Sequence, residues 1–446
     1  MAMNKNTKIV IAVVVILAAV VIVAAVFLLN NNEDVTKDAK EMENSELKMY
    51  GNINGDGFID DKDTKIIKGL IDQGKTAKDY PLADANQDGK ISQEDIDLLN
   101  KVIKGEICTI WHMNLFDENG DGTMDYVKTS TKFPISSIIC TGSSNTFMMF
   151  YLMGIIDEVK GASYGSSIDN LFNDTYKDTN KVVKLGTSSQ KIDFEDGKGA
   201  ASEVIHSKNV TAVISDWNRS YLPNYQDFET AGVDVVRLAA ATTDLTVMCH
   251  DYYMLGLLFQ KQDRAKEVVA YLKEVMGKID DAISRENKAI SAVASSMTNY
   301  YSVGDSDYTA IIKRLNGKNP LDAGSWGGTT SIKVLDNLDV FNTDKYRYEY
   351  VIHLRAYNAY TNDADVPKLY NDYTKTIAEY WEHKLDGQYL VNANIPIPAR
   401  LAYVASIFYD DIDKAWADQI HQGFVDKFFA KNDIKVSELP FIYPAA

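Results

Sequence analysis

The chain has 446 residues, a formal net charge of −17, and 46% hydrophobic and 11% aromatic residues. This length predicts two or three domains, and the apolar content is sufficient for a large buried core. The negative charge argues against nucleic acid and anionic lipid surfaces as partners, because both need a basic face. The three cysteines (Cys108, Cys140 and Cys249) are too few for a disulfide scaffold, and they lack the spacing of a zinc site.

An uncharged apolar run, "IVIAVVVILAAVVIVAAVFLL", extends from Ile9 to Leu29. Its length matches the roughly 20 residues that a helix needs to cross a bilayer. A cleavable signal peptide would have a shorter apolar core and a small-residue cleavage site, and neither is present. Lysines precede the run and acidic residues follow it, so the bulk of the chain is predicted to be extracellular. We therefore predict a transmembrane signal anchor over 1–30 and a location at the cell membrane.

After a predicted polar linker at 31–49, the segment 50–106 contains one acidic loop pattern twice. Each copy has oxygen donors at positions 1, 3, 5, 9 and 12, Gly at position 6, and then an amphipathic helical pattern. This is the EF-hand arrangement for Ca²⁺, in which position 7 contributes a backbone carbonyl. The predicted calcium ligands are Asn52, Asn54, Asp56, Phe58, Asp60 and Asp63 in the first loop, and Asp84, Asn86, Asp88, Lys90, Ser92 and Asp95 in the second.

Two such loops in register, each with Asp at position 12 and each entering one helix, resemble a type I dockerin module over 50–106. The resemblance implies a small all-α, EF-hand-like fold, two bound Ca²⁺ ions and a cohesin-containing protein as the partner. In dockerins, positions 10 and 11 of each loop help to select the cohesin. Those positions are Asp61, Lys62, Gln93 and Glu94 in this sequence.

The segment 107–132 contains a third acidic stretch, "DENGDGTMDYVK", which starts at Asp117. It has donors at positions 1, 3, 5 and 9, but position 12 is Lys128. The lysine removes a carboxylate and adds a repelling cation. We therefore predict a linker at 107–132, whose loop binds calcium weakly at most.

From residue 133 onward, short apolar runs alternate with helical patterns, as in "VDVVRLAA" followed by "DYYMLGLLF". This alternation predicts βα units with parallel strands. The stretch 263–290 is rich in helix formers and predicts one long connecting helix. The predicted fold class is therefore α/β, with Rossmann-like lobes at 133–262 and 291–446 joined by that helix. The small all-α module and the transmembrane helix precede these lobes.

Several stretches of this part are similar to the solute-binding proteins of ABC transporters in the iron-siderophore and vitamin B12 class. They include "FPISSIICTGSSNTFMMFYLMGIIDEVKGAS", "ASEVIHSKNVTAVISDW" and "DGQYLVNANIPIPARLAYVASIFYDD", and the similarity spans about 133–429. It implies a binding protein rather than an enzyme. The implied ligand is a metal chelate (ferric siderophore, haem or corrinoid), and the implied partner is an ABC permease that contacts Glu203.

Ligands of two-lobed α/β proteins lie at the carboxyl ends of the strands, where loops and helix N-termini point. Aromatic side chains there would stack on a flat macrocycle, and Arg219 and Arg355 would pair with anionic groups of the chelate. The predicted ligand-binding residues are Thr141, Ser143, Ser144, Asn145, Tyr164, Trp217, Arg219, Tyr221, Thr242, Thr243, Tyr300, Tyr301, Trp326, Arg355, Tyr357, Asn392 and Asn394.

These features predict a membrane-anchored, extracytoplasmic solute-binding protein that carries a calcium-dependent dockerin. An alternative is a cell-surface adhesin or assembly component whose two-lobed domain no longer transports. A dockerin-borne hydrolase is a third hypothesis, but it would need a clustered carboxylate pair that the sequence does not show. His250 and His353 are either axial ligands to a bound haem or cobalt, or structural histidines.

Overall fold

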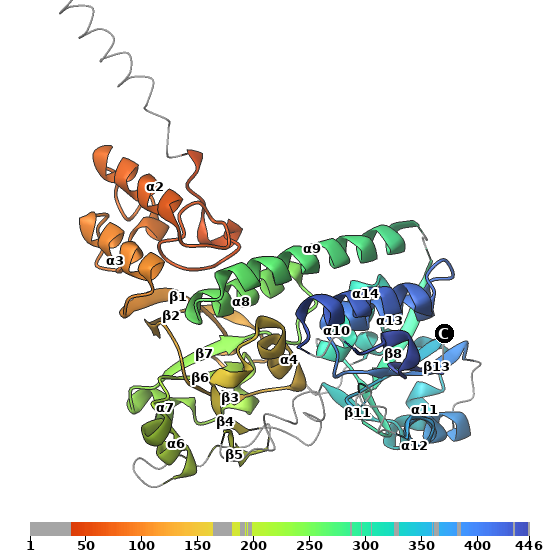
Figure 1. Cartoon of the computed structure of the whole chain (residues 1–446). Helices are drawn as coiled ribbons and strands as arrows, with labels where there is room; N and C mark the ends of the chain where they lie inside the picture. The colour runs from red at the N-terminus through yellow and green to blue at the C-terminus, as the bar shows by residue number, and fades with distance from the viewer. Residues whose placement is uncertain are drawn as a thin grey trace, which may run out of the picture.

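The computed structural model describes residues 37–163, 181–187, 192, 194, 199–285, 288–295, 297–304, 306–324, 330–358, 360, 365–380, 385–430 and 433–444. Figure 1 shows a front module (residues 37–106) beside two α/β lobes, with the long helix α9 running across both lobes. The predicted transmembrane segment 9–29 lies outside the described residues. Within them, no helix is both long and apolar enough to span a membrane.

The front module contains two helices, α2 (Asp61–Asp72) and α3 (Gln93–Lys104), each of which directly follows one acidic loop. Both helices begin with a capping box. At α3, the Ser92 hydroxyl accepts the N–H of Glu94, and the Asp95 carboxylate accepts the N–H of Ser92. The two helices pack against each other through their apolar faces. The acidic residues of each loop thus also fix the start of the following helix.

The predicted linker at 31–49 is described from residue 37 onward, and this part is folded against its neighbours. Leu47 and Met49 are at most 1% exposed, and Met49 forms an antiparallel bridge with His112. The prediction of a linker is therefore wrong for residues 37–49. The segment is mostly polar, and this composition led to the prediction of a linker. Burial of Leu47 and Met49 is nevertheless enough to anchor it in the core.

The predicted linker at 107–132 is instead a β-hairpin. Strand β1 (Cys108–Phe116) pairs antiparallel with β2 (Asp125–Phe133) over their full length, and the third acidic stretch lies at the turn. The hairpin packs on lobe 1, where the Asn114 side chain donates to the carbonyl of Val235 (2.9 Å). The linker prediction is wrong because two alternate buried positions of β1 hold the polar residues His112 and Asn114, so the strand shows no clear apolar alternation in the sequence.

Lobe 1 has a five-stranded parallel sheet in the order β5-β4-β3-β6-β7. Its strands are β3 (Ile138–Thr141), β4 (Val159–Ser163), β5 (Val183–Gly186), β6 (Ala212–Asp216) and β7 (Asp234–Leu238). Its helices are α4 (Ser144–Met153), α6 (Ala200–Lys208), α7 (Tyr225–Thr230) and α8 (Leu245–Leu258). The strand order reverses between β3 and β6, which is the topological switch point where ligands of open α/β sheets bind.

Lobe 2 has a second five-stranded sheet in the order β10-β8-β12-β13-β14, in which only β14 is antiparallel. Its strands are β8 (Ile290–Ser295), β10 (Gly317–Lys318), β12 (Tyr350–Arg355), β13 (Gly387–Asn392) and β14 (Ile442–Tyr443), and a separate pair is formed by β9 (Tyr300–Ser302) and β11 (Ser331–Lys333). Its helices are α10 (Asp307–Arg314), α11 (Leu338–Phe341), α12 (Val366–Tyr380), α13 (Ile397–Phe408) and α14 (Lys414–Phe428). The α/β class with parallel sheets in two lobes agrees with the sequence prediction.

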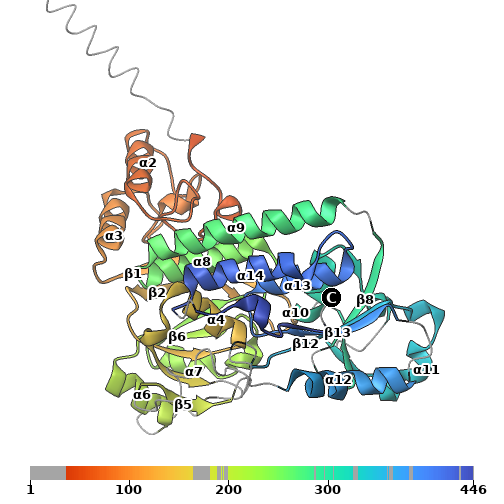
Figure 2. The ribbon, with the colours of Figure 1, turned by 45° about the vertical axis from the view of Figure 1, so that its right-hand side comes forward.

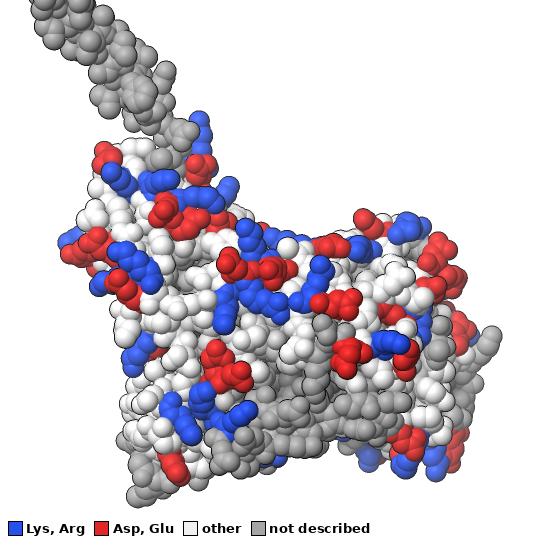
Figure 3. All heavy atoms as spheres, viewed as in Figure 1, with Lys and Arg blue, Asp and Glu red and all other residues white. Residues whose placement is uncertain are grey.

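Helix α9 (Gln262–Arg285) connects the lobes as one continuous element, and β8 follows from Ile290. Its buried residues recur at the helical period and pack on α8 of lobe 1 and α13 of lobe 2. Figure 2 shows α9 lying along α8 and the α13–α14 pair. In Figure 3, Lys and Arg are interspersed with Asp and Glu over α9 and the front module. Large domain movements need hinge residues, and a continuous helix such as α9 provides none along its length. We therefore expect the lobes to move little relative to each other.

Replacing Gly423 of α14 with Ala is expected to lower the free energy of unfolding by about 1–3 kcal/mol, the usual cost of overpacking. A Cβ there would come within 1.8 Å of the Tyr271 hydroxyl of α9. That hydroxyl is held by a hydrogen bond to the carbonyl of Ile420 (3.0 Å).

On α9 itself, a Cβ at Gly277 meets nothing within 4 Å. The control Gly277→Ala should therefore stabilise the chain by about 0.5–1 kcal/mol. Urea denaturation measures both variants, and equal effects would contradict tight α9–α14 packing.

Candidate functional site

A cleft between the lobes is lined by residues that follow parallel strands of both sheets. Its volume is about 280 Å³, close to the roughly 300 Å³ at which small-molecule sites begin. The loop after β6, the segment after β8 and the turn of the hairpin all contribute to it. The described lining residues are Gly122, Asp216, Trp217, Asn218, Ser220, Tyr221, Met297, Ser302, Ser306, Asp307, Tyr308, Thr330 and Ser331.

In lobe 1, the cleft wall is the turn that follows β6. Asp216 ends this strand, and its carboxylate accepts the N–H of Asn218 (3.2 Å). The Asn218 side chain then caps the short 3-10 helix η5 (Arg219–Tyr221). Thr141, at the end of β3, donates its hydroxyl to the carbonyl of Tyr221 (2.6 Å). These bonds fix the turn at the switch point between β3 and β6.

In lobe 2, the cleft wall is the N-terminal end of α10. Ser306 caps this helix, and its hydroxyl accepts the N–H of Thr309 (3.2 Å). Asp307 is the first residue of the helix, and its exposed side chain lines the cleft. An acidic side chain is favourable at this end of a helix because the backbone N–H groups there carry partial positive charge. Ser302 and Tyr308 complete this polar wall.

The two carboxylates of the cleft have raised pKa values. Burial raises the pKa of Asp216 to about 8, and the negative charge of Asp307 adds to this increase. A hydrogen bond from Asn218 and the charge of Arg237 act in the opposite direction. Asp307 is exposed to the cleft, but the protein on both sides of the cleft still desolvates its carboxylate and raises its pKa, against the opposing charge of Arg400. Desolvation therefore outweighs the favourable contacts of both groups.

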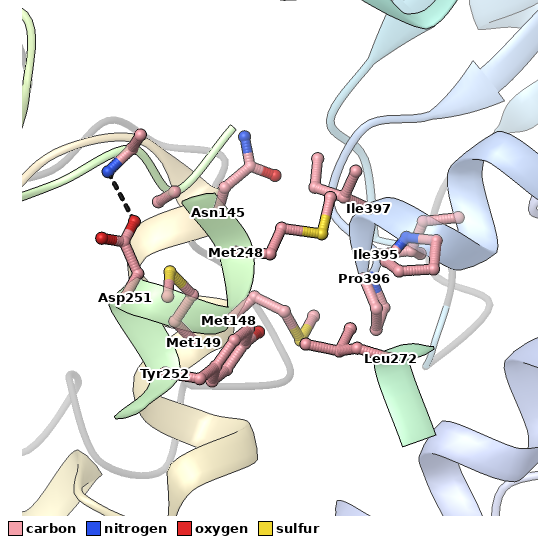
Figure 4. Close-up of a pocket in the computed structure, with 13 residues that line it drawn as sticks. Asn145, Met148, Met149, Met248, Asp251, Tyr252, Leu272, Ile395, Pro396 and Ile397 are labelled. Atoms are coloured by element: carbon pink, nitrogen blue, oxygen red, sulfur yellow. Dashed lines mark hydrogen bonds between the residues drawn. The ribbon is translucent and has the colours of Figure 1, made fainter. Parts of the chain in front are cut away.

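A second cavity, of only about 20 Å³, lies between the lobes where α8, α9 and α13 approach each other. Figure 4 shows Met148, Met149 and Met248 of lobe 1 on one side and residues 395–397 of lobe 2 on the other. The carboxylate of Asp251 accepts a backbone N–H at its edge (2.7 Å). A space of this size holds about one water molecule. It is an apolar contact between the lobes, and a chelate does not fit in it.

Three of the predicted ligand-binding residues line one of these two cavities. Trp217 and Tyr221 line the larger cleft, and Asn145 lines the small cavity. The side-chain oxygen of Asn145 accepts a hydrogen bond from the guanidinium of Arg400 (2.7 Å), so this residue also links lobe 1 to lobe 2.

The two predicted arginines do not line the cleft. Arg219 turns toward the hairpin, where it donates to the carbonyl of Glu118 (3.1 Å) and lies 6.0 Å from the ring centre of Phe116. Arg355 is exposed at the end of β12 and lies 6.0 Å from the ring centre of Tyr373. The geometry of the cleft therefore gives no support to their predicted pairing with anionic groups of a chelate.

The other predicted residues lie elsewhere. Tyr301 is buried, and its hydroxyl is hydrogen-bonded to that of Tyr348 in the core of lobe 2. Outside the described lining of both cavities lie Thr141, Ser143, Ser144, Thr242, Thr243, Tyr300, Tyr301, Tyr357, Asn392 and Asn394. Tyr164 and Trp326 lie outside the described residues. Glu203 is exposed in the first turn of α6, as a permease contact would require.

The charged residues of the cleft, Asp216 and Asp307, were missed in the sequence. Asp216 is the last residue of β6, so it stands at a strand end of the kind where ligands of α/β proteins bind. Asp307 follows Ser306 at a typical helix start, where Ser caps and an acidic residue occupies the first turn. Applying the strand-end rule to acidic residues, and not only to hydroxyl, amide, aromatic and Arg side chains, would have selected Asp216.

The first acidic loop has features that fit a bound cation. Asp63 is fully buried and accepts the N–H groups of Ile53 (2.9 Å) and Asp60 (3.0 Å). Burial raises the pKa of Asp63 to about 7. Asn52 is also fully buried, and its Oδ1 has no hydrogen-bond partner among the described residues. A buried carboxylate and an unpartnered amide oxygen would both be stabilised by Ca²⁺, which prefers oxygen ligands.

In the second loop, Asp84 at position 1 accepts the N–H groups of Asp88 (3.0 Å) and Gly89 (2.9 Å). Burial raises the pKa of Asp95 at position 12. Among the described residues, no group of three or more His, Cys, Asp or Glu side chains is placed to hold a metal ion. The loops would therefore depend on the amide and hydroxyl oxygens of Asn and Ser as well, and the two calcium sites stay a prediction.

Lys128, which counts against calcium in the third stretch, has a structural role. Its ammonium group donates to the side chain of Gln87 in the second loop (3.2 Å) and lies 5.6 Å from the ring centre of Trp111. The lysine thus joins the hairpin to the front module. Asp121 lies fully exposed at the hairpin turn. Weak calcium binding at this turn stays a prediction.

Comparison with solved structures identifies the architecture of the lobes. The TroA-like periplasmic binding protein FepB from Veillonella parvula matches with a TM-score of 0.52 and 16% identity, over 71% of this chain and 96% of that chain. The two lobes therefore share the fold of that protein. CeuE from Helicobacter pylori in an Ni-His complex (TM-score 0.48, 13% identity, 70% and 95% coverage) and a periplasmic haem-binding protein from Pseudomonas aeruginosa (0.44, 14%, 63% and 94%) match less well. No protein-family model and no curated protein matches the chain.

Proposed function

We propose that the two-lobed part of the chain is an extracytoplasmic solute-binding protein that passes a metal chelate to an ABC permease. The chelate would be a ferric siderophore, haem or a corrinoid. The observation that carries the proposal is a polar and aromatic cleft at the switch point of a TroA-like fold, in a protein whose lobes share the rigid helix α9. The matching solved structure from Veillonella parvula is described as a TroA-like periplasmic binding protein, which supports a binding role. A two-lobed domain that no longer transports could have its cleft filled by side chains. The open volume of the cleft therefore argues against this alternative.

The front module would bind two Ca²⁺ ions and dock to a cohesin-containing protein. The fit of its loop oxygens to calcium, and a helix directly after each loop, support this part of the proposal. The four residues that would select a cohesin are exposed; these are Asp61, Lys62, Gln93 and Glu94. A partner could therefore reach them while the module stays packed on the lobes. The run 9–29 would anchor the whole assembly in the cell membrane.

Ligand binding by the full chain, purified in detergent, is expected to raise its melting temperature. A chelate present at about 100 times its Kd should stabilise the fold by about 2.7 kcal/mol. The test is a thermal-shift series with haem, cobalamin and ferric siderophores, followed by absorption spectra of the chain after gel filtration, because haem and corrinoids are coloured. If no chelate shifts the melting temperature and none co-elutes, the transport proposal is wrong.

A further inference from the structure

The charge that the cleft presents to a ligand is negative. Of its lining residues in the described part of the chain, Asp216 and Asp307 are acidic and none is Lys, Arg or His. Asp307 is exposed to the cleft, so a ligand can reach its carboxylate directly. Asp216 lies opposite in lobe 1, and the charges of the two carboxylates interact. Asp216 is only 3% exposed and has a pKa of about 8, so it is mostly protonated at neutral pH, and Asp307 is the acidic group that a ligand can reach.

Two arginines lie near these carboxylates, but both are buried behind the wall and engaged elsewhere. Arg237 lies 3.9 Å from the ring centre of Phe116 and donates to the backbone carbonyl of Asp216 (3.1 Å). Arg400 donates to Asn145 and to the backbone carbonyl of Ala393, which directly follows β13. Each is at most 3% exposed. They moderate the negative charge without offering a guanidinium to the ligand.

The other residues that line the cleft also favour a ligand with a cationic group. Trp217, Tyr221 and Tyr308 bring aromatic rings to the cleft, and rings of this kind attract ammonium and other cationic groups through their electron-rich faces. The serine and threonine hydroxyls of the lining can accept hydrogen bonds from an ammonium group. A bare metal ion would lack protein ligands in the cleft, since the described residues hold no cluster of three His, Cys, Asp or Glu side chains that could bind it. A chelate brings its own metal ligands and needs none from the protein.

We propose that the cleft selects a metal chelate with a cationic group, such as a protonated amine, and discriminates against anionic chelates. The inference rests on the proposed binding function and narrows its ligand class. An anionic chelate would face the accessible Asp307 carboxylate without a reachable cation, and such like-charge placement is unfavourable at an interface. The arginine pairing expected from the sequence would have implied the opposite preference.

Isothermal titration of the full chain with three ferric chelates tests this selectivity. The probes are ferrioxamine B (a trihydroxamate with a free ammonium group), neutral ferrichrome, and a trianionic tris-catecholate. We expect ferrioxamine B to bind at least about tenfold more tightly than the tris-catecholate. Asp307→Asn should weaken ferrioxamine B by about tenfold, as expected for loss of a charged hydrogen bond, and change ferrichrome by less than about twofold.

Asp216→Asn provides a second variant and should weaken ferrioxamine B much less than Asp307→Asn does, because Asp216 is buried and mostly protonated at neutral pH. The matched control is Asp336→Asn, which removes an exposed acidic group of lobe 2 that does not line the cleft and should change no affinity. Tighter binding of the tris-catecholate, or equal weakening of all three chelates by Asp307→Asn, would overturn the cationic preference while the binding function stands. If none of the three chelates binds, and haem and cobalamin do not bind either, the proposed function itself is wrong.

Discussion

Chelation of calcium with EGTA is expected to lower the free energy of unfolding of the purified chain by about 2–3 kcal/mol for each loop that holds the ion at 100 times its Kd. The physical reason is that the buried carboxylate of Asp63 and the unpartnered oxygen of Asn52 would lose the cation that compensates their burial. The front module shares one hydrophobic core with the lobes. The loss should therefore appear in the main unfolding transition, which calorimetry with and without EGTA measures.

Substitutions assign this effect to particular loops. Asp95→Asn removes the carboxylate at position 12 of the second loop and should reduce the response to EGTA. Asp97→Asn, on the exposed face of α3 and outside the acidic loops, is the matched control and should leave the response unchanged. A wild-type chain whose melting curve and far-ultraviolet circular dichroism are identical with and without EGTA would show that neither loop binds calcium.

The predictable parts of this fold are those encoded over short distances. The capped helices α2 and α3 follow from loop and helix patterns within one stretch of chain, and α9 follows from a long run of helix formers with regular apolar spacing. The predicted end of α9 at 290 was too late, because Ile290 already belongs to β8. The polar run 284–288 follows Ile283, the last buried residue of α9, and this break in the apolar pattern is the signal that would have placed the boundary correctly.

The site was harder to predict because its residues meet only through the tertiary fold. Trp217 and Tyr221 were found, since both follow β6 directly. Tyr301 was wrongly expected at the ligand, because its sequence position near a strand end does not reveal that the ring points into the core of lobe 2. Arg219 also follows β6, but the hairpin, predicted as a linker, supplies the carbonyl and ring that hold its side chain.

The docking of the front module depends on Tyr253 of α8. Its ring lies 5.3 Å from that of Phe58 in an edge-to-face arrangement, and a Cβ on Gly57 would clash with it. Glu46 accepts a hydrogen bond from the Tyr253 hydroxyl and pairs with Lys273 of α9 (2.6 Å). Phe58 belongs to the first acidic loop, where its backbone carbonyl is a predicted calcium ligand. The ring of Tyr253 therefore links the first calcium loop to a helix of lobe 1.

Tyr253→Ala is expected to destabilise the chain by about 3–5 kcal/mol, the cost of removing a buried aromatic ring. The ring is 6% exposed, and its loss would open a cavity between the front module and α8. The calorimetric transition should split, with an EGTA-sensitive part for the module and an EGTA-insensitive part for the lobes.

Tyr253→Phe keeps the ring contact and loses only the bond to Glu46, so it should cost about 0.5–1.5 kcal/mol and keep one transition. A single, fully EGTA-sensitive transition in Tyr253→Ala would mean that other contacts, such as the bond from the Lys48 N–H to His250, hold the module in place without this ring.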